Sequence, residues 1–277
     1  MTPAADAARG PLSAGERVLL VDPKERRYLT TLTPGAMFHT HSGIVAHDDV
    51  IGRAEGSTVG ATTGRQFVVV RPTLADVVLK MPRGAQVIYP KDLGAILLAA
   101  DIGPGMRVLE AGVGSGALSM TLLRAGAEVT GYEVRADFAA GARANVASWC
   151  GADARYRVEE RDVYEGIEER DLDRVVLDLP EPWRVLGPAT GALRPGGILL
   201  AYLPSITQVA TLREAMASSA FGMAETSEVL RRTWHVEQRS VRPDHRMVAH
   251  TGFLTTARLL VPPDEARAAG ARLSPAR

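Results

Sequence analysis

The sequence has a single cysteine, Cys150, and no apolar run as long as the roughly 18 residues that a transmembrane helix requires. One cysteine excludes an internal disulfide and is typical of proteins that work in a reducing compartment. The N-terminal segment also lacks the basic start and apolar core of a secretory signal. We therefore expect a cytoplasmic protein with no membrane segment, in which Cys150 is a small buried hydrophobe.

The sequence also lacks an excess of either charge. Its 277 residues include 32 Lys and Arg and 32 Asp and Glu, so the formal net charge is zero. Because nucleic-acid binders often carry a basic excess, composition gives no support to an RNA partner, and such a partner must be argued from particular residues. With 46% hydrophobic and 23% charged residues, the chain suits one large or two smaller globular domains.

The sequence pattern changes after about residue 75. Before that point, short β-prone runs alternate with turn signals such as Asp22-Pro23, which predicts a small barrel or sandwich. The β-prone runs are residues 17–21, 28–32, 43–46 and 66–70. We expect an N-terminal β-rich domain at 1–75, a second domain at 76–262 and a loose C-terminal tail at 263–277, with 74–83 linking the two domains.

The most informative stretch is residues 108–118, VLEAGVGSGAL. A short apolar run ends near the acidic Glu110 and is followed by a glycine-rich turn and a helix-forming segment. This order predicts a buried parallel strand whose end opens onto a helix N-terminus, where open α/β sheets bind nucleotide-like ligands. Glu133 ends the next apolar run, where a carboxylate can bind a ribose diol. We therefore expect a cofactor that carries an adenosine.

Two classes of cofactor fit this pattern. Gly112, Gly114 and Ala117 satisfy the loose G-x-G-x-x-G/A pattern of dinucleotide-dependent dehydrogenases, which is weak evidence alone. S-adenosylmethionine (SAM) is favoured because Glu110 precedes the first glycine by two residues, where it can meet an amino or cationic group. The position of the loop, after a substantial N-terminal segment, also favours SAM. We predict SAM as the cofactor and keep an NAD-dependent oxidoreductase as the alternative.

From about residue 89 helical and strand patterns alternate, which predicts a mostly parallel sheet covered on both faces. The expected helices are 90–98, 117–125, 135–148, 184–192 and 206–219, and the expected strands are 107–111, 128–133, 155–159, 174–178 and 197–203. Residues 224–235 and 247–260 then look like two long strands without a helix between them. The predicted fold class is α/β: a Rossmann-like, seven-stranded SAM methyltransferase fold with a small N-terminal β domain.

A second motif, residues 178–183 (DLPEPW), follows an apolar strand. It places Asp178 at the carboxyl end of a central strand, where open α/β sheets bind ligands, and its prolines stiffen the loop. Methyl transfer from a sulfonium is an in-line displacement that depends on positioning. Asp178 could accept a hydrogen bond from an exocyclic amine and push electron density towards a ring nitrogen. The alternative role is capping of the next helix, and Trp183 is equally compatible with the core and with base stacking.

Three motifs together resemble the tRNA (adenine-N1)-methyltransferases that modify position 58 of the T loop, and the actinobacterial members most of all. They are residues 110–116 (EAGVGSG), 178–183 (DLPEPW) and 242–255 (RPDHRMVAHTGFLT). The first is shared by many methyltransferases, whereas the other two are more selective, and the resemblance covers nearly the whole chain. It implies SAM as the methyl donor, the T arm of tRNA as the substrate, 1-methyladenosine as the product, and a homotetramer.

The resemblance also implies a set of functional residues, with Asp178 as the catalytic one. The implied cofactor-binding residues are Ile88, Glu110, Gly112, Gly114, Ser115, Gly116, Ala117, Leu118, Glu133, Asp162, Val163 and Asp178. Among these, Glu133 would hold the ribose hydroxyls, and Asp162 and Val163 would flank the adenine. Some relatives carry a basic residue five places after Glu133. That residue is Phe138 here, so no charged contact is carried over to that site.

Basic residues in the C-terminal part are candidates for contacts with tRNA phosphates. They are Arg231, Arg232, Arg242, Arg246 and His250. For any one arginine a solvated surface charge is an equally good explanation, and Lys24, Arg26 and Arg27 are weaker candidates. His39 and His41 would share one face of a strand, but no further ligand pattern completes a zinc site, so we expect no metal.

Two further alternatives remain open at the level of sequence. One is a methyltransferase of the same fold that acts on a protein carboxylate or a small molecule, which would suit the neutral net charge. The other is a non-catalytic RNA-binding subunit, which the intact glycine-rich loop and Asp178 argue against.

Overall fold

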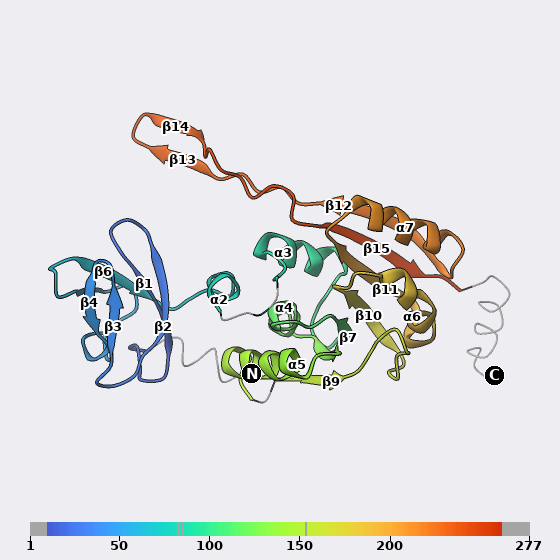
Figure 1. The fold of residues 1–277 in the computed structure, drawn as a ribbon, viewed down its shortest axis with the longest axis horizontal. Coiled ribbons are helices and arrows are strands. Elements are labelled where there is room, and N and C mark those ends of the chain that lie inside the picture. Colours follow the sequence, from blue (N-terminus) through green and yellow to red (C-terminus); the bar gives the residue numbers. More distant parts are fainter. Residues whose placement is uncertain (1–9, 82–83, 85, 153, 262–277) are drawn as a thin grey trace, which may run out of the picture. The chain divides into compact units, whose positions relative to one another are not determined.

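The computed structural model describes residues 10–81, 84, 86–152 and 154–261, and Figure 1 shows its fold. The chain divides into two compact units, Met1–Pro82 and Arg83–Arg277. The division falls after Pro82 rather than after residue 75 because the expected link forms a helix, α2 (Leu74–Lys80), that belongs to the first unit. Asp76 of this helix forms a 3.0 Å ion pair with Arg27 of the same unit. The predicted tail at 263–277 lies outside the described residues.

The first unit is built from short antiparallel strands around its own core. Its strands are β1 (Arg17–Val21), β2 (Arg27–Thr31), β3 (Met37–Thr40), β4 (Gly43–Ala46), β5 (Thr58–Gly60) and β6 (Gln66–Val70), and η1 (His47–Asp49) is a short 3-10 helix. One sheet has the order β2-β1-β6-β5, and β3 pairs with β4. Alternation along β6 buries Phe67 and Val69 completely, as expected for a strand with one face on a core. Strands β3 and β5 were not predicted.

The second unit contains a seven-stranded sheet with the order β12-β15-β11-β10-β7-β8-β9. The strands are β7 (Arg107–Ala111), β8 (Glu128–Glu133), β9 (Tyr156–Glu160), β10 (Leu172–Leu177), β11 (Leu193–Leu203), β12 (Phe221–Glu228) and β15 (Phe253–Leu259). Strands β7 to β11 are parallel, and β15 is antiparallel to both β11 and β12. The strand order reverses between β7 and β10, so their carboxyl ends form the switch point where such sheets bind ligands.

The helical elements of the second unit are α3 (Pro90–Ala99), α4 (Ala117–Arg124), α5 (Ala136–Cys150), η2 (Pro182–Val185), α6 (Leu186–Ala192) and α7 (Ile206–Ala217). The helices α4 and α5 follow connections that run one way across the sheet, and α6 follows a connection in the opposite direction. Because parallel crossovers are right-handed, opposite directions place helices on opposite faces, as Figure 1 illustrates. Among the described residues, no helix is long and apolar enough to span a membrane.

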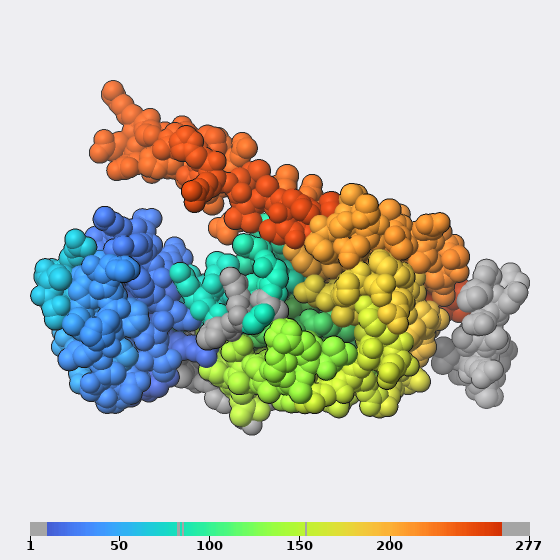
Figure 2. Space-filling view, viewed as in Figure 1, coloured from blue at the N-terminus to red at the C-terminus, as the bar shows by residue number. Residues whose placement is uncertain are grey.

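The two long strands predicted near the C-terminus are wrong in extent. Strands β12 and β15 do pair in the sheet, but the segment between them leaves the sheet and forms a hairpin of β13 (Trp234–Glu237) and β14 (Ser240–Pro243). Between the sheet and the hairpin, a single bridge pairs Arg231 of the outgoing arm with Val248 of the returning arm. We call residues 229–252 the ribbon; Figure 2 shows it standing away from the body of its own unit.

Candidate active site

The glycine-rich loop connects β7 to α4 and lies against the end of β10. Gly112 has a φ of 85°, which favours glycine, and a Cβ there would collide with the carbonyl oxygen of Asp178. The Asp178 N–H donates to the Ala111 carbonyl at 2.9 Å, so the two strand ends are joined at this point. Gly112 therefore lets the loop approach Asp178 as closely as backbone atoms allow.

Glu110 brings a buried carboxylate to the same point. One of its oxygens, Oε2, accepts a 2.6 Å hydrogen bond from the Ser119 hydroxyl. The other, Oε1, is buried and has no partner among the described residues. Burial, reinforced by the nearby charges of Asp178 and Glu133, raises the pKa of Glu110 to about 8. An unpartnered buried carboxylate oxygen is costly, so a ligand with an amino or cationic group would relieve that cost.

Glu133 supports the loop from the end of β8. Its Oε2 accepts from the Gly114 backbone N–H at 3.0 Å, and its Oε1 accepts from the Arg135 N–H at 3.0 Å. A carboxylate oxygen can accept more than one hydrogen bond, so both oxygens keep capacity for the hydroxyls of a ribose. The contact also fixes the loop relative to β8. Glu110 and Glu133 together fit a ligand with an amino group and a ribose.

Asp178 lies directly after β10 with its carboxylate available. No hydrogen bond of the carboxylate to another described residue contributes to its pKa, which burial raises to about 6. The residue at the N-cap of η2 is Glu181, so Asp178 does not cap the next helix and that interpretation is wrong. Trp183, in the same motif, packs against the hydrophobic core. Asp178 is thus a titratable group at the switch point whose carboxylate has no hydrogen-bond partner within the described part of the chain.

One pocket of the second unit collects most of the predicted cofactor residues. It is lined by Gln86, Val87, Ile88, Glu110, Gly112, Val113, Gly114, Ser115, Ala117, Leu118 and Asp178. Of these, Gln86, Val87 and Val113 were not predicted. Gly116 is the N-cap of α4, immediately next to this lining. The cofactor roles of all these residues stay predictions.

Four predicted cofactor residues do not line this pocket: Gly116 and Glu133, which adjoin or support the glycine-rich loop, and Asp162 and Val163. Val163 is 3% exposed and belongs to the hydrophobic core on the sheet, and the Oδ1 atom of Asp162 accepts a 2.8 Å hydrogen bond from the Tyr164 N–H. Both lie in the loop after β9, where the described residues form no helix before β10. Their predicted contact with an adenine would therefore come from this loop, in which the carboxylate of Asp162 already accepts a hydrogen bond from the neighbouring backbone.

Tyr202 lies beside Asp178 at the end of the neighbouring strand β11, and sequence reasoning missed it. Leu177 pairs with Ala201 in the parallel register of β10 and β11, so the next residues, Asp178 and Tyr202, lie at the same level of the sheet. The Tyr202 hydroxyl donates to the Thr251 carbonyl at 2.8 Å. Burial raises the pKa of Tyr202 to about 12, so it is a neutral phenol at physiological pH. Its position on β11 carries no signal in the sequence beyond that of an apolar strand.

The predicted RNA-binding residues all lie on the ribbon and are all exposed. Among the described residues, no ion pair or side-chain hydrogen bond engages the guanidinium of Arg231, Arg232, Arg242 or Arg246, so these groups are free for phosphate oxygens. His250 differs because both of its ring nitrogens are engaged, by Glu228 at 2.9 Å and by the Pro204 carbonyl at 3.1 Å. An RNA contact through either nitrogen would require one of these bonds to break.

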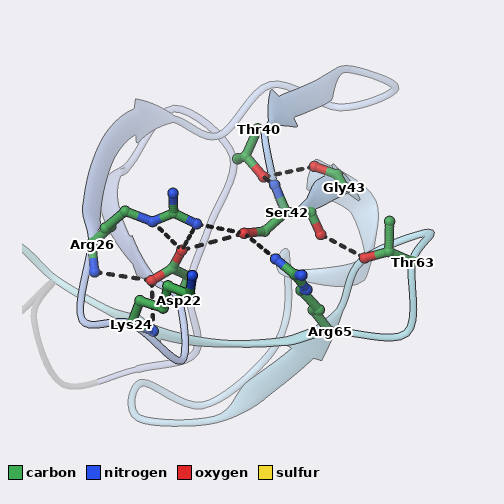
Figure 3. Close-up of polar contacts among 8 residues, drawn as sticks. All are labelled: Asp22, Lys24, Arg26, Thr40, Ser42, Gly43, Thr63 and Arg65. Carbon is green, nitrogen blue, oxygen red and sulfur yellow. Dashed lines mark hydrogen bonds and ion pairs between the residues drawn. The ribbon is translucent and has the colours of Figure 1, made fainter.

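Among the weaker RNA candidates of the first unit, Arg26 is already engaged by other side chains. Figure 3 shows the buried Asp22 holding the Arg26 guanidinium, while the Ser42 hydroxyl accepts from Arg26 at 2.8 Å and from Arg65 at 3.1 Å. This network joins three turns, and the pKa of Asp22 is lowered to about 2 because the bonds to Arg26 and Lys24 outweigh desolvation. Arg26 is therefore held in a fixed pose rather than left as a free surface charge.

The two candidate metal ligands, His39 and His41, do not share one strand. Strand β3 ends at Thr40, so His39 lies on the strand while His41 lies in the following turn. Among the described residues, no group of three or more His, Cys, Asp or Glu side chains is placed to hold a metal ion.

The sheet order, the glycine-rich loop and the acidic residues at the ends of β7, β8 and β10 define a Rossmann-like SAM-dependent methyltransferase. Residues 10–59 match the family described as TrmI-like N-terminal, and residues 66–245 match the family described as tRNA methyltransferase complex GCD14 subunit. The chain belongs to the tRNA (adenine-58-N1)-methyltransferase family. The predicted fold class, family and cofactor class are thereby confirmed.

Individual relatives support this assignment. The chain is 41% identical over 245 residues to the tRNA (adenine(58)-N(1))-methyltransferase TrmI of Thermus thermophilus. The alignment covers 87% of this chain and 96% of that protein. The solved tRNA (m1A58) methyltransferase TrmI of Aquifex aeolicus has a TM-score of 0.82 at 31% identity, covering 91% of this chain and 100% of that one. The solved structure of a SAM-dependent O-methyltransferase of Thermotoga maritima has a TM-score of 0.88 at 33% identity, covering 91% of this chain and 96% of that one.

Proposed function

We propose that this protein transfers a methyl group from SAM to N1 of adenine 58 in the T loop of tRNA, giving 1-methyladenosine. The observation that carries the proposal is the arrangement of Asp178, an unengaged carboxylate at the switch point, against the glycine-rich loop that Glu110 precedes and Glu133 supports. Family membership supplies the tRNA substrate and the modified position.

The residues of this site fit SAM, which supplies an electrophilic methyl group on its sulfonium. Glu110 offers its unpartnered Oε1 to the amino group of the ligand, and Glu133 offers lone pairs to the ribose hydroxyls. Both acids lie at the ends of neighbouring parallel strands, and Glu133 is bound to the loop through Gly114. The protein thus orients the cofactor with groups that are already fixed before binding.

The acceptor needs orientation more than deprotonation. Adenine N1 is mostly unprotonated at neutral pH and has a lone pair, so no strong base is required. The carboxylate of Asp178 would accept a hydrogen bond from the exocyclic N6 amine and make N1 more electron-rich. Because the product is cationic, the same carboxylate stabilises the charge that develops during transfer. The neutral phenol of Tyr202 lies at the level of Asp178 on the neighbouring strand.

Access to adenine 58 requires the enzyme to expose a base that is held in the folded tRNA, at a cost of a few kcal/mol. Phosphate contacts can offset this cost. The unengaged ribbon arginines, Arg231, Arg232, Arg242 and Arg246, are the proposed source of these contacts. They concentrate positive charge locally in a chain whose net charge is zero.

The test is methyl transfer from labelled SAM to an unmodified tRNA transcript, beside the same transcript with adenine 58 replaced by guanine. Label on the first and none on the second supports enzyme class, substrate and position together. Label on both moves the acceptor elsewhere in the tRNA. Label on neither, with SAM binding shown by calorimetry, directs the search for an acceptor to proteins and small molecules.

We also propose that the protein is a homotetramer in which the ribbon contacts another copy of the chain. The ribbon carries apolar side chains that the single chain leaves exposed: Leu230 at 55%, Trp234 at 59%, Val236 at 70% and Val241 at 62%. A two-stranded hairpin is marginally stable alone in water, and a contiguous apolar surface usually marks an interface. A second copy would cover this surface and stabilise the hairpin.

Replacing both Trp234 and Val236 with aspartate is expected to reduce the mass of the particle measured by light scattering. Both side chains are exposed, so the fold of each copy should be retained, as circular dichroism can verify. Leu98→Asp is the matched control because Leu98 is 86% exposed on α3 of the same unit. A monomeric wild type would refute the assembly, and an unchanged mass in the double variant would exclude the ribbon from it.

A further inference from the structure

Lys91 and Asp92, at the start of α3, form an ion pair that is almost completely buried. The Nζ–Oδ1 distance is 2.8 Å, and the side chains are 3% and 0% exposed. Lys91 also donates to the Val229 carbonyl at 2.6 Å and to the Thr251 hydroxyl at 2.5 Å. The hydroxyl of Thr251 in turn donates to Asp92 Oδ2 at 2.6 Å. Every N–H of the ammonium and both carboxylate oxygens therefore have partners.

The partners of this pair lie where the ribbon leaves the sheet. Val229 directly follows β12, and Thr251 lies two residues before β15. One ammonium group therefore holds both strands of the ribbon at their roots and attaches them to α3 (Figure 1). Breaking a buried ion pair is strongly destabilising because it leaves an uncompensated charge. The ion pair therefore keeps the ribbon root in a fixed position against α3.

The same contacts extend to Tyr202, the neighbour of Asp178. The Thr251 carbonyl accepts from the Tyr202 hydroxyl at 2.8 Å, and a Cβ at Gly252 would collide with the Tyr202 ring. Tyr202 lies level with Asp178 across β10 and β11. A shift of the ribbon root would therefore move Tyr202 next to Asp178, while Glu110 and Gly112 have their own supports, the Ser119 hydroxyl and the Tyr132 carbonyl.

We propose that Lys91 and Asp92 are positioning residues for the methyl acceptor. They act through Thr251, which fixes Tyr202 beside Asp178, and they leave the binding of SAM to other residues. This inference rests on the proposed function because it assigns the lined pocket to the cofactor and the region beside Asp178 and Tyr202 to the acceptor. It predicts that substitutions in the Lys91–Asp92 pair lower the turnover of tRNA without weakening the binding of SAM.

Thr251→Val is the least disruptive test because it replaces a hydroxyl with a methyl group of the same shape and keeps the carbonyl that Tyr202 uses. We expect kcat for the tRNA transcript to fall about tenfold or more, as expected when positioning is lost. The dissociation constant for SAM should stay within about twofold. Thr251→Ser, which keeps the hydroxyl, should restore most of the turnover, and Lys91→Met should reproduce the loss.

Arg174→Met is the matched control for a general loss of stability. Arg174 is also buried, at 3%, and it holds the opposite end of α3 through the carbonyls of Ala100 and Asp101. This variant should lower the unfolding temperature about as much as Lys91→Met, yet leave kcat within about twofold of wild type. An equal loss of kcat in Arg174→Met, or a normal kcat in a folded Lys91→Met, would overturn the proposal.

Hydrogen exchange gives a readout that does not depend on the acceptor. Lys91→Met should accelerate amide exchange at residues 200–204 and 249–254, and Arg174→Met should not. If wild type labels no tRNA but this pattern is found, the proposed function fails while the positioning of Tyr202 stands. If wild type labels tRNA but exchange at these residues is unchanged in Lys91→Met, the inference fails alone.

Discussion

Replacing Asp178 with alanine is expected to lower kcat for tRNA methylation on the order of 100-fold or more, the usual loss for a positioned catalytic group. The carboxylate lies at the switch point of the sheet and makes no hydrogen bond that contributes to its pKa, so it is available to a ligand. Its removal takes away both the acceptor for the exocyclic amine and the counter-charge for the cationic product. Single-turnover methyl transfer from labelled SAM measures the effect directly.

Asp178→Asn separates the charge of this residue from its shape. The amide keeps the size and one acceptor oxygen but has no negative charge, so a loss close to that of alanine assigns the effect to the charge. Calorimetry with SAM should be run on both variants. Near-normal turnover with unchanged SAM binding would remove Asp178 from the mechanism.

The raised pKa of Asp178 adds a pH dependence. Burial brings this pKa to about 6, and the carboxylate is the form that accepts a hydrogen bond. Activity should therefore be full above this value and fall as the pH drops through it, by about tenfold per pH unit below. The profile of kcat/KM for wild type should show this fall, and the residual activity of Asp178→Asn should not. A flat profile for wild type would contradict this prediction.

Much of the fold and of the cofactor side could be predicted because the signals are local. Strands β7 and β8 were predicted with their observed bounds, since each is a short apolar run that ends at a turn. Glu110 and Asp178 could be named because the carboxyl ends of parallel strands adjacent in the order meet at one edge. Eight of the predicted cofactor residues line one pocket for this reason: Ile88, Glu110, Gly112, Gly114, Ser115, Ala117, Leu118 and Asp178.

The acceptor side could not be predicted because it depends on contacts between distant parts of the chain. The hydrogen bond between Lys91 and Thr251 joins residues 160 positions apart, and no local pattern marks either as buried and paired. The prediction of two long strands in place of the ribbon failed for a different reason. Alternating residues such as Trp234 and Val236 have the pattern of a sheet strand, but their side chains face solvent in the single chain. Periodicity indicates a β conformation without indicating which partner covers the apolar face.

The second large effect is expected from Gly112→Ala, which should weaken SAM binding on the order of 100-fold. Gly112 has a φ of 85°, where an L-residue is strained by about 1–2 kcal/mol. The larger cost is steric, since the added Cβ would collide with the backbone oxygen of Asp178, which has no flexible end to move away. Either the loop or the end of β10 must shift, and both hold groups assigned to the ligands. Calorimetry with SAM is the measurement.

Gly105→Ala is the control that separates strain from collision. Gly105 has a φ of 77° in the turn before β7, and a Cβ there meets nothing within 4 Å. It should lower the unfolding temperature through the same kind of backbone strain and leave SAM binding within about twofold of wild type. If Gly112→Ala binds SAM no worse than Gly105→Ala, the close approach of the loop to Asp178 is not what forms the cofactor site. If only Gly112→Ala loses SAM, the contact between the ends of β7 and β10 is part of the site itself, because the strain common to both variants cannot account for the difference.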